Sequence, residues 1–89
     1  MATYTKALPG VLDYAIDWSA WLGVDTIATS AWEVDTGVTI DSDTNTDTVA
    51  TVWISGGVIG TKYEAINTIE TASGRTDRRY INISVVEAR

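Results

Sequence analysis

Acidic side chains are the first candidates for chemistry in this chain, because clustered carboxylates can bind cations. In the segment 41–47, DSDTNTD, oxygen-bearing side chains recur at every second position, as in the first half of an EF-hand calcium loop. Such a loop also needs Gly at its sixth position and Glu at its twelfth. Thr46 and Val52 stand there instead. We therefore interpret the segment as a solvated polar loop, with an irregular calcium site as the alternative, and predict no metal.

A second pair of carboxylates, Asp13 and Asp17, lies four positions apart in a segment with strand periodicity. Residues at that spacing on a strand are roughly 13 Å apart, whereas glycosidase-like pairs need about 5–10 Å. The chain also has no His and no Cys. These absences remove the commonest general base, the thiol nucleophile and the usual transition-metal ligands. We therefore expect no enzyme, no catalytic residue and no cofactor.

The four tryptophans of this 89-residue chain are its most unusual feature. Trp32 alternates with Val34 and is our candidate for the core. Trp53 belongs either to the core or to a contact face. Trp18 and Trp21 fall in an irregular segment, where we expect exposure. Exposed Trp is a typical anchor of protein interfaces, and it also serves for stacking on carbohydrate, so both kinds of ligand stay open.

Three arginines cluster near the end of the chain. Arg75, Arg78 and Arg79 surround Asp77 in and after a Gly-containing hairpin loop. One interpretation is a solvated turn with a local ion pair, which would contribute about 0–1 kcal/mol. The other is an anchor for an acidic partner surface, because Arg is enriched in interfaces. The candidate interface residues are therefore Trp18, Trp21, Trp53, Arg75, Arg78 and Arg79.

The elements that must position these residues are short strands. Alternation of period two, broken by Gly, Pro and Asp/Asn signals, predicts about seven strands and hence an all-β sandwich or barrel. Residues 1–10 are expected to be an N-terminal arm, and residues 11–89 one domain. The segment 17–23 breaks the alternation and predicts a single helical turn, begun by Asp17 and ended by Gly23. Six of the expected strands can be located, at residues 12–16, 26–34, 38–40, 48–55, 62–71 and 78–87.

The expected core follows from the same alternation. Tyr63, after Gly-Thr-Lys, has the position of the tyrosine corner of immunoglobulin-like domains. The residues that we predict to be mostly buried are Leu12, Ile16, Trp32, Tyr63, Ile69, Ile81, Ile83 and Val85.

The charge of the chain restricts its partners. The net charge is −6, with eight acidic residues and one Lys in residues 1–50, and four acidic and five basic residues in 51–89. An acidic chain is a poor ligand for nucleic acid. No stretch approaches the roughly 20 apolar residues of a membrane span, so we expect no membrane association. The uneven charge suits head-to-tail packing of subunits, or is ordinary solubilising charge.

Three segments of the chain carry a resemblance to a known family. These are LDYAIDWSAWLGVDTIATSAWEV, NTDTVATVWISGG and YEAINTIETASGRTDRRYINISV. Over about residues 11–87 they resemble the small virion proteins of tailed bacteriophages known as fiber-tail adaptor or head–tail structural proteins. The resemblance implies an immunoglobulin-like antiparallel β-sandwich that works by contact and has no catalytic residue.

We therefore expect a virion structural protein that joins tail, fibre or head–tail connector components, in multiple copies, after assembly in the host cytoplasm. A capsid decoration protein with the same fold is the nearest alternative. A carbohydrate-binding module that uses Trp18, Trp21 or Trp53 is the alternative from another class.

Overall fold

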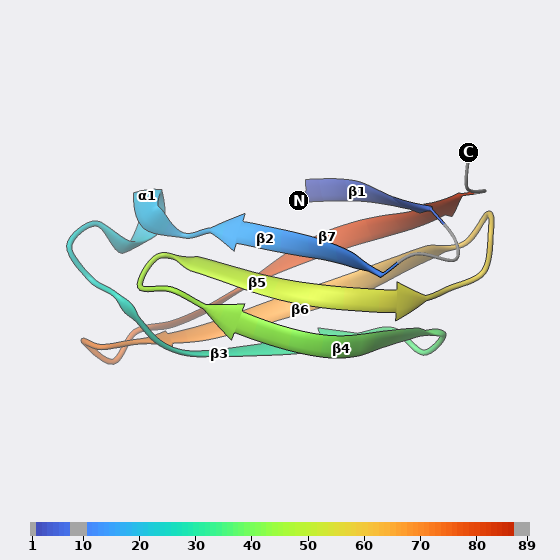
Figure 1. Ribbon diagram of the computed structural model, residues 1–89. Coiled ribbons are helices and arrows are strands. Elements are labelled where there is room, and N and C mark those ends of the chain that lie inside the picture. The colour runs from blue at the N-terminus through green and yellow to red at the C-terminus, as the bar shows by residue number, and fades with distance from the viewer. Residues whose placement is uncertain (1, 8–10, 87–89) are drawn as a thin grey trace.

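The computed structural model describes residues 2–7 and 11–86, which fold into two stacked sheets (Figure 1). One sheet has four strands in the order β1-β7-β6-β3, and the other has three in the order β2-β5-β4. The predicted seven-stranded sandwich is thus confirmed. The elements are β1 (Ala2–Ala7), β2 (Leu12–Asp17), α1 (Ser19–Leu22), β3 (Ile27–Val34), β4 (Val38–Asn45), β5 (Val49–Gly56), β6 (Lys62–Thr71) and β7 (Thr76–Val86).

The segment expected to be an N-terminal arm is in part a strand. Its residues 2–7 form β1, which pairs with β7 from Ala2↔Ile81 to Ala7↔Val86. This pairing is parallel, whereas the other strand pairs of both sheets are antiparallel. The remaining residues of the expected arm, 1 and 8–10, lie outside the described part of the chain. The local sequence pattern did not predict this strand, because its pairing partner is almost 80 positions away.

The core lies between the two sheets and consists of side chains that alternate along each strand. Seven of the eight predicted core residues are buried, and Leu12 is not, with 36% of it exposed. Leu12 lies opposite the buried Ile54, so it points toward the interior. However, it is the first residue of an edge strand, at the rim of the sandwich, where the second sheet does not cover it. The buried apolar residues are Tyr14, Ile16, Trp18, Leu22, Ile27, Trp32, Val38, Ala50, Val52, Ile54, Tyr63, Ala65, Ile69, Ile81, Ile83 and Val85.

Two edge strands depart from the predicted pattern. In β3 the register shifts between Ile27 and Thr29. Ile27 is therefore buried and Ala28 exposed, although strict alternation with Trp32 would place Ala28 on the inner side. The prediction of a loop over residues 41–47 is wrong for most of the segment, because β4 continues to Asn45. Backbone pairing with β5 holds this polar segment in a strand. As β4 is an edge strand, its polar side chains stay in water.

The helical turn forms where it was predicted. The backbone N–H of Ser19 donates to the carboxylate of Asp17 at 2.9 Å, and Gly23 ends the turn with φ = 63°. Leu22 points into the core. In Figure 1 the turn lies at one end of the sandwich, between β2 and β3. Within the described ranges, no helix is both long and apolar enough to cross a membrane.

The opposite end of the sandwich is closed by Tyr63, as the tyrosine-corner prediction requires. Its hydroxyl accepts a 2.9 Å hydrogen bond from the backbone N–H of Val58, five residues upstream. The chain passes so close to the core here that a Cβ on Gly57 would lie 2.7 Å from Val85 Cγ2. Gly57 also has φ = 103°, which favours glycine. The β5–β6 loop is therefore held by the Tyr63 hydroxyl and by the close approach of Gly57 to the core.

Candidate interface

Trp18 does not lie where the sequence suggested. We expected an exposed ring in irregular structure, but the residue is completely buried, so that expectation is wrong. Trp18 immediately precedes α1, and its ring belongs to the core cluster between the two sheets. The backbone N–H of Trp18 donates to Thr48 O at 2.8 Å, which fixes this arrangement. Trp18 is thus a core residue of the domain.

The partner of the Trp18 ring is a buried amide. Its Nε1 donates to Asn67 Oδ1 at 2.9 Å. The Nδ2 of Asn67 in turn donates to Ser30 Oγ at 2.9 Å and to Ala31 O at 3.1 Å. Asn67 is itself fully buried, so each polar atom of its side chain has a partner, as burial demands. The sequence contained a signal for this site, because Asn67 interrupts the inward-facing series of β6.

Two arginines of β7 and its preceding hairpin cover the tryptophans of the turn. The guanidinium of Arg75 lies 4.3 Å from the ring centroid of Trp21, and that of Arg79 lies 4.2 Å from that of Trp18. The two rings contact each other edge to face, with centroids 5.5 Å apart. Such stacking is a recognised attraction between a cation and the face of an indole. Trp21 remains half-buried, so its ring is partly covered by the chain itself.

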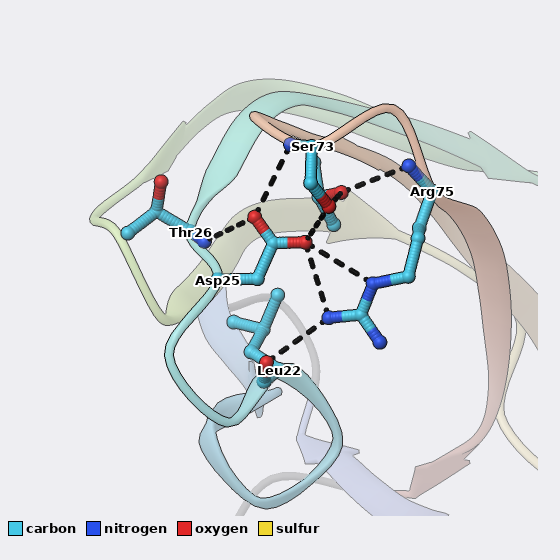
Figure 2. Close-up of polar contacts among 6 residues, drawn as sticks. Leu22, Asp25, Thr26, Ser73 and Arg75 are labelled. Atoms are coloured by element: carbon cyan, nitrogen blue, oxygen red, sulfur yellow. Dashed lines mark hydrogen bonds and ion pairs between the residues drawn. The ribbon is translucent and has the colours of Figure 1, made fainter.

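A carboxylate that the sequence analysis did not single out orders this cluster (Figure 2). Asp25 accepts hydrogen bonds from the hydroxyl of Ser73 and from Arg75 Nε at 3.1 Å, and forms an ion pair with Arg75 Nη2 at 3.1 Å. Arg75 Nη2 also donates to Leu22 O at 3.0 Å. The hairpin is thereby tied to the end of α1. The expected partner, Asp77, instead accepts from the backbone N–H of its neighbour.

The electrostatics of Asp25 follow from these contacts. Hydrogen bonds from Ser73, above all, and then from Thr71, Thr26 and Arg75, lower the pKa of the Asp25 carboxyl well below its ordinary range, against an opposing effect of desolvation. The carboxylate is therefore charged at neutral pH, where it can pair with Arg75. We name the set Trp18, Trp21, Asp25, Arg75 and Arg79 the turn–hairpin cluster.

The other two predicted interface residues lie elsewhere. Trp53 is on the central strand β5, on the outer face of the three-stranded sheet, and is half-buried. Arg78 is exposed and pairs in register with Thr68, on the outer face of the four-stranded sheet. The structure thus brings Trp18, Trp21, Arg75 and Arg79 together and separates Trp53 and Arg78 from them.

The described residues include no group of three or more His, Cys, Asp or Glu placed to hold a metal ion. In the segment considered as a calcium loop, Asp41 accepts a 2.8 Å hydrogen bond from Ser55 Oγ. The turn–hairpin cluster contains cations and aromatic rings that already contact one another. These contacts stabilise one end of the fold, and the exposed parts of the cluster form a surface there.

Comparison with known proteins bears on both fold and family. The solution structure of the PKD domain from the KIAA 1837 protein is 21% identical to the chain, with a TM-score of 0.55. The match covers 97% of this chain and 79% of that domain. This likeness confirms the immunoglobulin-like β-sandwich.

The family is shown by a second comparison. A family model described as podophage GP4 fiber-tail adaptor protein gp77 matches residues 6–84. The chain belongs to this family. The resemblance found in the sequence is therefore confirmed, and the matched region of the gp77 family includes the whole turn–hairpin cluster and Trp53. No curated protein matches the chain.

Proposed function

We propose that this protein is a structural component of a phage virion that joins tail, fibre or head–tail connector components by protein–protein contact. The observation that carries the proposal is the match of residues 6–84 to the fiber-tail adaptor family. The partners would be other virion proteins, contacted by multiple copies of the chain in a symmetric assembly formed in the host cytoplasm.

The architecture supports a role that depends on rigidity. An adaptor must hold two neighbours in a fixed relation, and a sandwich whose ends are both fixed by side-chain contacts can do so. At one end Arg75 ties the hairpin to Leu22 of α1 and to Asp25 in the loop that follows. At the other, Tyr63 holds the β5–β6 loop. Neither contact requires a ligand.

The surface supports contact rather than catalysis. The candidate interface comprises the half-buried Trp21 and the arginines of the turn–hairpin cluster at one end, together with Trp53 and Arg78 on the two outer faces. Trp21 already carries a guanidinium on one face of its ring. This arrangement leaves at most one face of the Trp21 ring for a partner, and the adjacent guanidinium also suits contact with an acidic protein surface.

The test is the location of the chain in intact particles. We expect electron cryo-microscopy and cross-linking mass spectrometry of purified virions to place the chain beside tail, fibre or connector proteins, in a copy number that matches their symmetry. Contact with the major capsid protein alone would replace the adaptor function with capsid decoration. Absence of the chain from purified virions would refute a structural role.

A further inference from the structure

The outer face of the three-stranded sheet has an aromatic residue at its centre. Trp53 lies in register with Asp13 on β2 and with Ser42 on β4. Residues directly opposite one another in an antiparallel pair point to the same side of the sheet. Trp53 is therefore flanked by a carboxylate on one side and by a hydroxyl on the other, and its ring is only half-buried.

The charge on this sheet has a single sign. Strands β2, β4 and β5 contain no Lys or Arg. Asp13 and Asp17 lie on the outer face, whereas Asp43 lies opposite the buried Val52 and so points to the inner side. Asp41 is placed on the outer face by the hydrogen bond that it accepts from Ser55, because Ser55 is two residues from Trp53 on the same strand. The face thus combines one indole with neighbouring carboxylates and no basic side chain from its own strands.

The turn–hairpin cluster shows what this combination binds within the same molecule. There, the Arg75 guanidinium lies on the Trp21 ring and forms an ion pair with Asp25. The Arg79 guanidinium lies on the Trp18 ring. Trp53 has the ring and nearby carboxylates, but no arginine of the described residues lies over it. The turn–hairpin cluster combines a ring, a carboxylate and a cation, and, among the described residues, the outer face around Trp53 lacks the cation.

We propose that the outer face of the three-stranded sheet, which we name the Trp53 face, binds an arginine-bearing segment of another virion protein, with a guanidinium over the Trp53 ring and beside Asp13. This inference depends on the proposed function only for the partner's place in the virion. Complementary charge selects the partner, since an acidic field attracts a basic segment and repels an acidic one.

A second copy of the chain is a poorer occupant than a different protein. Arg75 and Arg79 are engaged within the turn–hairpin cluster. Among the described arginines this leaves Arg78, which lies on the opposite face among residues of mixed charge such as Glu64 and Glu70. A second copy docked through Arg78 would therefore bring these carboxylates against the acidic Trp53 face, whereas a basic segment of a different protein would not.

The first experiment uses the full chain, labelled with ¹⁵N, and a hexa-arginine peptide as the probe. We expect saturable chemical-shift changes at the indole N–H of Trp53 and at amides of β2 and β5, weakened by salt because exposed charges are screened. Hexaglutamate should cause none. Either no change with hexa-arginine, or changes centred on Glu33 and Glu70 of the other sheet, would overturn the proposal.

A matched pair of variants locates the binding. Asp13→Lys places a cation opposite Trp53, and Glu33→Lys makes the same charge change on the outer face of the other sheet. Both positions are exposed, so both variants should fold. We expect Asp13→Lys to weaken hexa-arginine binding about tenfold or more and Glu33→Lys to change it about twofold or less. Equal effects would mean that only net charge matters, which overturns the specific site.

Two further readouts separate this inference from the proposed function. Concentration-dependent shifts at Trp53 without peptide would show that a second copy occupies the face, against the proposal. In particles, a photo-reactive residue in place of the exposed Ser42, which lies opposite Trp53 on β4, should cross-link to an Arg-containing peptide of a different virion protein. A chain absent from particles but positive in the peptide assay refutes the virion role alone. A chain present in particles but negative in the peptide assay refutes the Trp53 face alone.

Discussion

The Trp18 indole and the Asn67 amide are joined by a 2.9 Å hydrogen bond, although the two residues are 49 positions apart. Both are completely buried. The bond connects the turn α1 to the four-stranded sheet, and it satisfies polar atoms that no water reaches. A ring that looked like an interface anchor in the sequence therefore contributes to folding, and its contribution can be measured.

Replacing Asn67 with Ala should destabilise the domain by about 1–3 kcal/mol, because the buried Trp18 Nε1–H loses its acceptor. Asn45→Ala is the matched control. Asn45 is exposed on an edge strand, so its replacement should change stability by about 0.5 kcal/mol or less. Chemical denaturation of the three purified proteins measures both differences. Equal stabilities for the two variants would mean that the buried amide contributes nothing to the fold.

The tryptophans should differ in what they stabilise. Trp18→Ala should destabilise the isolated domain by about 3–5 kcal/mol, close to the whole stability of a small domain. Trp53→Ala should leave it folded, since the side chain lies on an outer face and is only half-buried, and should reduce incorporation into particles. Thermal melting and abundance in purified virions are measured together. A Trp18→Ala variant that melts like the parent would show that the ring is not a core residue.

Stability should depend on pH through Asp25. Its pKa is lowered in the folded state, chiefly by the hydrogen bond from Ser73, relative to about 3.9 in an unfolded chain. The unfolded state therefore binds a proton first as the pH falls, so this contribution is complete above about pH 5 and decreases progressively below it.

Denaturation of the parent and of Asp25→Asn between pH 7 and pH 2 tests this dependence. The stability difference between the two should shrink as the pH falls. Asp13→Asn, at an exposed position, is the control. A constant difference between the parent and Asp25→Asn over the whole range would contradict the assignment.

The rim and the centre of the core should respond differently to truncation. Ile83→Ala should cost about 2–5 kcal/mol, through lost transfer free energy and a cavity, because Ile83 is fully buried. Leu12→Ala should cost clearly less, since 36% of Leu12 remains exposed. Urea denaturation curves of both variants, fitted with a common m-value, measure the two losses of stability. A loss at Leu12 as large as that at Ile83 would show that the rim is closed in solution.

The sequence predicted the parts of the fold that local pattern determines. Alternation placed Ile16 and Ile83 inside, and the break at Asp17 and Gly23 located the helical turn. It failed where long-range pairing decides. The strand β1 exists because β7 offers it a free edge, and β4 extends through a polar segment because β5 pairs with it.

The candidate interface shows the same division. The sequence identified Arg75 and Arg79 as a group and the tryptophans as unusual. It could not show that these arginines lie on Trp21 and Trp18, because the contacts join segments more than 50 positions apart. Asp25 was missed for the same reason: alone in its stretch of sequence, it acquires its partners only when the β6–β7 hairpin reaches it.

The parallel pairing of β1 with β7 has a mechanical consequence. The pairing begins at Ala2↔Ile81 and ends at Ala7↔Val86, so the first residue of β1 and the last residue of β7 lie at opposite ends of the paired segment. Tension applied between Ala2 and Val86 pulls along the strands and stretches all of their hydrogen bonds at once. Bonds sheared together resist more force than bonds opened one after another. A domain connected to two neighbours through these strands would therefore unfold only at high force.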